Sequence, residues 1–121
     1  MRKNNLKLGN KGEKIAQKYL ESKGYDFLEK NCQNKYGEID LIMKQKENIV
    51  FVEVKTRTGE RFGSPEDAVN KNKIRRLIKN SRAYIIKNGF SGASCRIDAV
   101  CVVLDENQKL KRINHYENIT A

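Results

Sequence analysis

Two acidic residues and one lysine have the types and spacing that metal-assisted hydrolysis requires. Asp40 interrupts one apolar stretch, and Glu53 and Lys55 flank a valine in another. Mg²⁺ takes oxygen ligands and usually keeps several waters while it is bound by one or two carboxylates and by substrate phosphates. A lysine beside such a metal can orient the attacking water or balance charge on a phosphate. The chemistry expected of these three residues is therefore hydrolysis of a phosphate ester with Mg²⁺ or Mn²⁺.

A β-hairpin is expected to bring the two carboxylates together. Residues 39–43 and 50–54 alternate between apolar and other side chains, and a polar turn separates the two stretches. If the hairpin is symmetric about its turn, Asp40 lies directly opposite Glu53, and Lys55 projects from the same face. Like charges placed across a strand pair are destabilising unless something neutralises them. The register therefore favours a divalent cation between Asp40 and Glu53.

The apolar residues of the hairpin also limit the fold class. A sheet that is apolar on both faces needs helices on both, which predicts an α/β fold. An ordinary salt-bridged strand surface stays an equal alternative from the register alone, although the apolar neighbours of the acids need to be covered. One face is expected to carry Ile39, Leu41, Met43, Val50, Val52 and Val54, and the other Ile42 opposite Phe51.

The other elements follow from periodicity and capping signals. A first amphipathic helix is expected over Leu8–Lys23, ended by Gly24, with Glu13 at the margin of its apolar stripe. A long second helix is expected to begin at Ser64–Asp67 and to run to about Asn88. One domain over residues 1–121 would hold all of them. The further strands expected are Tyr25–Leu28, Cys95–Leu104 and Lys109–His115, and the segment Asn31–Gly37 is expected to be a loop.

The charge of the chain favours a polyanionic partner. Its 121 residues include 25 Lys and Arg against 15 Asp and Glu, which gives a net charge of +10. No acidic residue lies between Asp67 and Asp98, so the excess is concentrated in and around the second helix. A solvated basic face is the alternative, but the one-signed segment favours phosphate binding. The residues expected to grip phosphates are Lys71, Lys73, Arg75, Arg76, Lys79 and Arg82 on the helix, and Arg57 in the loop before it.

The expected location is the cytoplasm. The three cysteines lack metal-ligand spacing and are odd in number, which suggests neither a disulfide framework nor a zinc site and favours a reducing compartment. No segment approaches the roughly 18 apolar residues of a membrane span, and the N-terminus has no apolar stretch. We therefore expect no membrane association.

Several single residues have less specific interpretations. His115 is expected to be a packing or surface residue rather than a catalyst. Asp98 and Arg96 are expected to form a buried or half-buried ion pair on their strand. Tyr36 and Phe62 are expected to pack on loops, and stacking on a splayed nucleic-acid base is the alternative.

The motifs of the hairpin resemble those of a known family. The segments Gly37–Ile42 and Phe51–Arg57 are similar to the YraN-type family of small bacterial proteins. That family is similar in fold to restriction endonucleases and archaeal Holliday-junction resolvases, which implies a restriction-endonuclease-like mixed β-sheet flanked by helices. The resemblance covers nearly the whole chain and extends to Gly9, Gly12, Glu13, Asn31, Arg61–Gly63, Lys73, Arg75–Leu77, Tyr84, Arg96 and Asp98.

The resemblance implies roles for the site residues and a function. In that nuclease superfamily, an Asp followed by Glu-x-Lys binds the metal and assists the water, so Asp40 and Glu53 would be ligands and Lys55 the catalytic lysine. Glu13 would be an additional metal-binding acid, although an exposed helix glutamate is an equal alternative. The expected function is a nuclease acting on DNA, including branched DNA, and resolvase relatives suggest a homodimer. Two alternatives stay open: a non-catalytic nucleic-acid-binding adaptor of the same fold, and a basic scaffold without metal.

Overall fold

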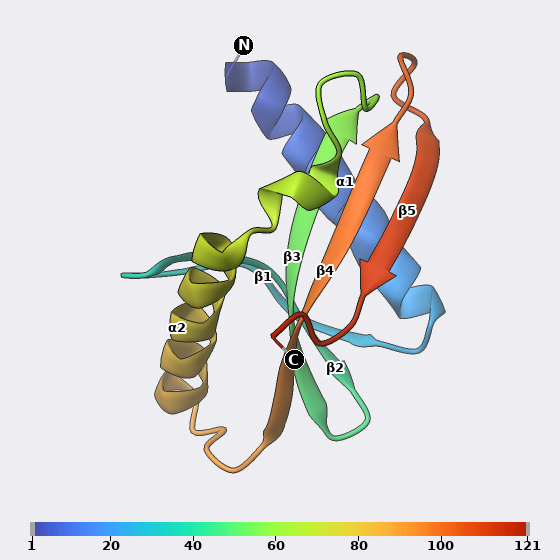
Figure 1. Cartoon of the computed structure of the whole chain (residues 1–121). Helices are drawn as coiled ribbons and strands as arrows, with labels where there is room; N and C mark the ends of the chain where they lie inside the picture. Colours follow the sequence, from blue (N-terminus) through green and yellow to red (C-terminus); the bar gives the residue numbers. More distant parts are fainter. Residues whose placement is uncertain (1, 121) are drawn as a thin grey trace.

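The computed structural model of the protein describes residues 2–120, with side chains from Lys7 to Thr120. Met1 and Ala121, the ends of the expected domain, lie outside the described residues. Five strands form one sheet in the order β1-β2-β3-β4-β5, in which only β3 and β4 are parallel (Figure 1). The elements are α1 (Arg2–Ser22), β1 (Asp26–Asn34), β2 (Gly37–Gln45), β3 (Asn48–Thr58), the 3₁₀ helix η1 (Pro65–Ala68), α2 (Lys71–Lys87), β4 (Ser94–Leu104) and β5 (Leu110–Tyr116).

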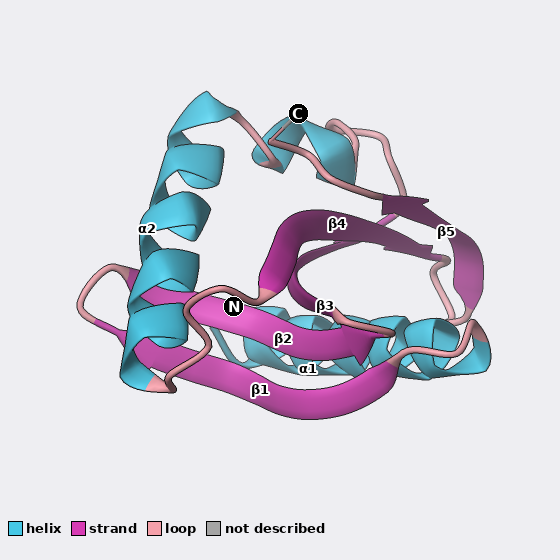
Figure 2. Ribbon diagram, turned by 90° about the horizontal axis from the view of Figure 1, so that it is seen from below, coloured by secondary structure: helices cyan, strands magenta, loops and turns pink. Residues whose placement is uncertain are grey.

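Helices cover both faces of the sheet, which confirms the α/β prediction. Helix α1 crosses one face, and η1 and α2 lie on the other side (Figures 1 and 2). Ala16 and Leu20 of α1 pack in one buried cluster, and Leu77 and Tyr84 of α2 pack in a second. The described helices include none that is both long and apolar enough to cross a membrane.

The predicted hairpin register is confirmed for β2 from Leu41 to Gln45, but the predicted pairing of Asp40 directly opposite Glu53 is not part of the ladder. Leu41 pairs with Val52, and Ile42 with Phe51. The ladder ends at Leu41, and the next residue, Asp40, accepts the backbone N–H of Val54 with its carboxylate instead, at 2.8 Å. The expectation that Ile39 shares a face with Leu41 is wrong, because Ile39 packs in the α2-side cluster. Strand β2 therefore leaves β3 at Asp40.

The predicted long helix from Ser64 to Asn88 is wrong, because the segment forms two helices. The Ser64 start is real: its backbone N–H donates to the Asp67 carboxylate, at 3.2 Å. However, η1 ends after one turn, and Asn70 then caps α2 by accepting the N–H of Lys73 at 3.0 Å. Asparagine is among the strongest N-cap residues, so it starts a second helix where periodicity alone predicted continuation. Lys73 consequently lies in the first turn of α2.

The segment Asn31–Gly37 was expected to be a loop, and this expectation is wrong. Strand β1 continues to Asn34 and pairs with β2 almost to the turn, because the paired backbone overrides the weak local strand preference of Asn, Gln and Lys. The tip of this two-stranded arm reaches α2, where the Asn34 amide donates to the carbonyl of Asn80 at 3.3 Å. Asn31 adopts a left-handed backbone conformation (φ 50°), which asparagine tolerates better than most residues.

Candidate functional site

Asp40 and Glu53 lie together where β2 leaves β3. The side chain of Glu53 is 3% exposed. Burial and the neighbouring Glu53 carboxyl raise the pKa of Asp40 well above its ordinary value, although the hydrogen bond from the Val54 N–H acts in the opposite direction. One buried and one half-buried carboxyl group side by side favour the approach of a cation or a proton. The structure thus brings together the first two predicted ligands.

Lys73 joins this pair, which the sequence did not predict. Its Nζ lies 3.1 Å from Oε2 of Glu53, and its side chain is 27% exposed. It had been assigned to the phosphate-gripping surface, but the helix break at Asn70 turns it toward the acidic site. Lys73 is therefore the cation in contact with Oε2 of Glu53, and this buried oxygen has no other partner among the described groups.

Glu13 reaches the margin of the same site from α1. The helix passes close to β3 because Gly12 has no side chain: a Cβ there would lie 1.8 Å from Oγ1 of Thr56. Glu13 is half-buried and accepts a hydrogen bond from the Asn31 side-chain amide at 2.9 Å. Burial raises the pKa of Glu13, the Asn31 hydrogen bond partly offsets this, and the charge of Asp40 adds to the rise. Asn31 therefore positions Glu13, a role that the sequence did not assign.

The three carboxylates do not converge as closely as a dehydrated metal site requires. Among the described residues, ligand atoms of Asp40, Glu53 and Glu13 do not all lie within 4.8 Å of one another. Mg²⁺ keeps several waters and needs only one or two direct carboxylates. The geometry therefore suits direct contact from Asp40 and Glu53, with Glu13 reaching a bound ion through water.

Lys55 is one of the residues that line a cavity. It lies two residues beyond Glu53 on β3, so both side chains project from the same face, and it is half-buried. The cavity measures about 510 Å³ and is lined by residues of α1, of the end of β3 and of the following loop. It forms because β3 pairs only with β4 beyond the point where β2 departs. Besides Lys55, its lining includes Leu8, Gly9, Arg57, Arg61, Phe62 and Gly63.

The predicted basic surface lies mostly in solvent, with Lys73 as the exception. Arg57 is exposed and lines the cavity next to Lys55. Among the side chains that the structure describes, the remaining five basic residues predicted on α2 form no ion pair with an acid. These exposed residues of α2 are Lys71, Arg75, Arg76, Lys79 and Arg82.

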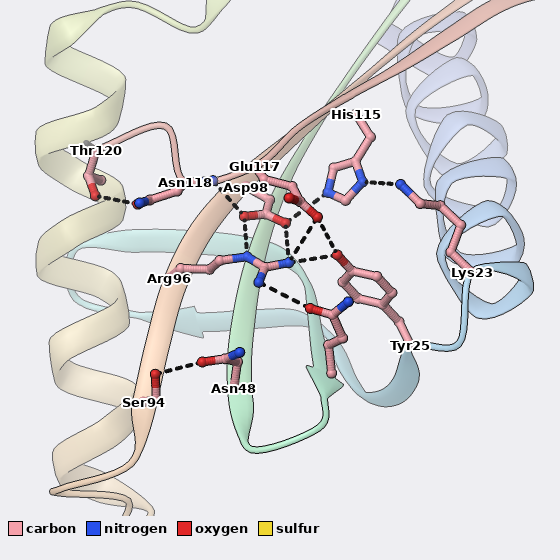
Figure 3. Close-up of polar contacts among 11 residues, drawn as sticks. Lys23, Tyr25, Asn48, Ser94, Arg96, Asp98, His115, Glu117, Asn118 and Thr120 are labelled. Carbon is pink, nitrogen blue, oxygen red and sulfur yellow. Dashed lines mark hydrogen bonds and ion pairs between the residues drawn. The ribbon is translucent and has the colours of Figure 1, made fainter.

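A second polar cluster lies around Asp98, which is fully buried (Figure 3). Arg96 Nε donates to Asp98 at 3.0 Å, which confirms the predicted ion pair. His115 Nε2 lies 2.8 Å from the same carboxylate, and Lys23 Nζ lies 2.9 Å from His115 Nδ1. Because an ammonium can only donate, Nδ1 accepts from Lys23, and the N–H of Nε2 donates to the Asp98 carboxylate. His115 is thus a buried structural residue, as expected.

This cluster could offer three ligands to a metal, since atoms of Asp98, His115 and Glu117 lie within 4.8 Å of one another. However, the guanidinium of Arg96 already contacts both carboxylates, at 3.0 Å from Asp98 and 3.4 Å from Glu117. A cation there would have to displace Arg96. We therefore assign the cluster to stability, and Asp40 and Glu53 remain the candidate site.

The fold and the site define a class: a small mixed α/β protein with a pair of acidic residues, one buried and one half-buried, at the point where β2 leaves β3. The chain belongs to the uncharacterised protein family UPF0102, whose family model matches residues 12–102. It is 47% identical over 120 residues to the UPF0102 protein TTE1452 of Caldanaerobacter subterraneus subsp. tengcongensis, covering 98% of each chain. It is 45% identical to the UPF0102 protein CD630_12710 of Clostridioides difficile, covering 95% of this chain and 97% of that one. UPF0102 is the YraN-type family that the sequence motifs predicted, so the predicted family is confirmed.

We expect Mn²⁺ to stabilise the protein against heat through the Asp40 site. A ligand that binds only the folded state stabilises it by about 2.7 kcal/mol at one hundred times its dissociation constant. Differential scanning fluorimetry of the wild type should show a melting temperature that rises with Mn²⁺ concentration, and Asp40→Asn should lose this response. Asp98→Asn serves as the matched control and should keep it. A response lost in Asp98→Asn and kept in Asp40→Asn would place the metal in the second cluster instead.

Proposed function

We propose that the protein is a metal-dependent nuclease that hydrolyses phosphodiester bonds, with DNA as its expected substrate. The observation that carries the proposal is the pairing of half-buried Asp40 with buried Glu53 where β2 leaves β3, two residues from Lys55, which lines a cavity. The five-stranded mixed sheet with helices on both sides is compatible with a restriction-endonuclease-like fold, which we propose together with the activity.

The roles of the residues follow from their positions. Asp40 and Glu53 would hold Mg²⁺ or Mn²⁺, and the bound metal would polarise a phosphate oxygen and acidify a water. Lys55 would orient that water and offset charge on the phosphate. Glu13, fixed by Asn31, would hold a second water at the edge of the site. Arg57, exposed beside Lys55, would bind a phosphate adjacent to the one that is cut.

One contact favours the alternative, a nucleic-acid-binding adaptor without turnover. The ammonium of Lys73 already lies 3.1 Å from Glu53, so part of the acidic charge is neutralised without a metal. If this ion pair is permanent, the pair Asp40 and Glu53 has no need for a second cation. In the nuclease, Lys73 must release Glu53 or share it with the metal.

The deciding experiment is cleavage of a labelled panel of single-stranded, duplex, flap and four-way-junction DNA. The wild type should cut with Mn²⁺ or Mg²⁺ and should not cut with EDTA. Glu53→Gln, which keeps the shape of the side chain but removes its charge, should not cut under either condition. Binding to the panel without cutting by either protein would establish the adaptor and end the nuclease proposal.

Nucleic-acid binding should weaken steeply as salt is raised, because the exposed arginines and lysines of α2 contact phosphates and not bases. Each phosphate contact on duplex DNA contributes about −0.9 to the slope of log K against log salt. Neutralising Lys79 and Arg82 together should make the slope shallower by about 2. Fluorescence anisotropy measured at salt concentrations from about 50 to 200 mM gives this slope. A slope that is unchanged in this double variant would remove α2 from the binding surface.

Two expectations stay predictions of the sequence. A homodimer follows only from the resemblance to resolvases, which cut two strands with two sites. Size-exclusion chromatography with light scattering would test it. A cytoplasmic location likewise rests only on the cysteine pattern of the sequence.

A further inference from the structure

The loop between β3 and η1 holds Phe62 in solvent beside the candidate site. Its side chain is 94% exposed, so the expectation that it packs on the protein is wrong. A single exposed apolar side chain needs no explanation by itself. Phe62 differs from such a side chain because it lies on a fixed loop between two cavities.

Ion pairs to one arginine fix the loop on both sides of Phe62. Arg112 of β5 binds Glu60, which precedes Phe62, and Glu66, which follows it, with distances of 2.8 and 2.9 Å to the two Glu66 oxygens. The backbone of Gly59 also donates to the carbonyl of Leu104 at 2.9 Å. The loop is therefore tied to β4 and β5 at its base, and Phe62 is held outward by a fixed scaffold.

Phe62 separates two hollows. On one side is the cavity that contains Lys55 and Arg57. On the other is a second cavity of about 530 Å³, lined by Thr58, Asn107 and Lys111 among others. Arg61 and Phe62 line both cavities, and the guanidinium of Arg61 lies 5.4 Å from the centre of the Phe62 ring. The second cavity also contains the acids Asp105 and Glu106, so the basic groups that can bind phosphates lie mainly on the Lys55 side of the aromatic ring.

We propose that Phe62 is a stacking platform for an unpaired base, so that the substrate is nucleic acid with a single-stranded segment next to the bond that is cut. This inference rests on the proposed function and narrows its substrate class. An exposed ring attracts a base in a sequence-tolerant way because every base has a π-face, whereas a base inside a duplex has both faces covered by its neighbours. Arg57 and Arg61 bind the phosphates on either side of the stacked base.

The test measures binding without turnover. Wild type, Phe62→Ala and Phe62→Trp are titrated in EDTA against a labelled single strand and a blunt duplex of equal length. Phe62→Ala should weaken binding of the single strand by about 5- to 150-fold, the range for one stacked base, and should leave duplex binding unchanged. Phe62→Trp should keep single-strand affinity and should quench 2-aminopurine placed in the strand. Ile86→Ala, which removes another strongly exposed apolar side chain (74%) at the far end of α2, is the control and should bind as the wild type does.

The outcomes separate this inference from the nuclease proposal. Equal affinity of Phe62→Ala and wild type for the single strand, or an equal loss on both substrates, overturns the stacking platform even if the wild type cuts DNA. A selective loss on the single strand supports it even if no variant cuts, in which case only the nuclease proposal fails. A wild-type dimer that dissociates in Phe62→Ala, with unchanged affinity for nucleic acid, would assign Phe62 to an interface between copies of the chain and overturn the inference.

Discussion

Replacing Lys55 with alanine is expected to slow cleavage of nucleic acid by about two to three orders of magnitude, the usual loss when one group that stabilises transition-state charge is removed. Lys55 is half-buried and projects from the same face as Glu53, toward the cavity where a phosphate would lie. It is not a metal ligand, because an ammonium offers no lone pair. The loss should therefore appear in the rate at saturating Mn²⁺, and the affinity for Mn²⁺ should not fall.

Single-turnover cleavage and isothermal titration with Mn²⁺ together measure this separation. Lys55→Arg keeps the positive charge but not the compact ammonium, so it should recover only part of the rate. Lys44→Ala removes an exposed lysine elsewhere on the sheet and should cut at the wild-type rate. If Lys55→Ala cuts as fast as wild type, Lys55 has no catalytic role and the cavity needs another assignment.

The acidic pair could be predicted because it depends on local rules. Alternation with a period of two, interrupted by a short polar turn, leaves little freedom in the register of a hairpin. The pairs Leu41–Val52 and Ile42–Phe51 followed directly from it. Alternation could not show that the β2–β3 ladder stops at Asp40. There, the Asp40 carboxylate accepts the backbone N–H of Val54 in place of a backbone carbonyl. This departure opens the sheet and creates the cavity.

The rest of the site depends on contacts between distant segments. Whether Lys73 faces solvent or Glu53 depends on where α2 begins, and the Asn70 cap that sets this position competes with an equally good start at Ser64. The approach of Glu13 depends on a missing side chain at Gly12 and on an amide at Asn31, in a segment that local preference assigns to a loop. The periodicity of a single segment cannot predict contacts of this kind between distant segments.

Asp98→Ala is expected to destabilise the protein by about 3–5 kcal/mol, the cost of leaving a buried partner charge uncompensated. Asp98 is fully buried and receives hydrogen bonds from Arg96, from His115 and from the backbone N–H of Asn118. Its removal leaves the half-buried Arg96 guanidinium with only Glu117 as a charged partner. Urea unfolding followed by circular dichroism measures the change, and Asp26→Ala, at an exposed site on β1, should stay within about 0.5 kcal/mol of wild type.

The stabilisation from Asp98 should also disappear in acid. The direction of this pH dependence follows from the lowered pKa of Asp98. Burial alone would raise the pKa of Asp98, but hydrogen bonds from His115 and Arg96 outweigh it and hold the pKa below its ordinary value. A carboxyl group with a lowered pKa in the folded state stabilises that state above the unfolded pKa of about 3.9, and the stabilisation is lost as pH falls through the folded value. The difference between wild type and Asp98→Ala should therefore be full at pH 7 and shrink only in strong acid. A difference that was already lost at pH 6 would contradict the lowered pKa of Asp98.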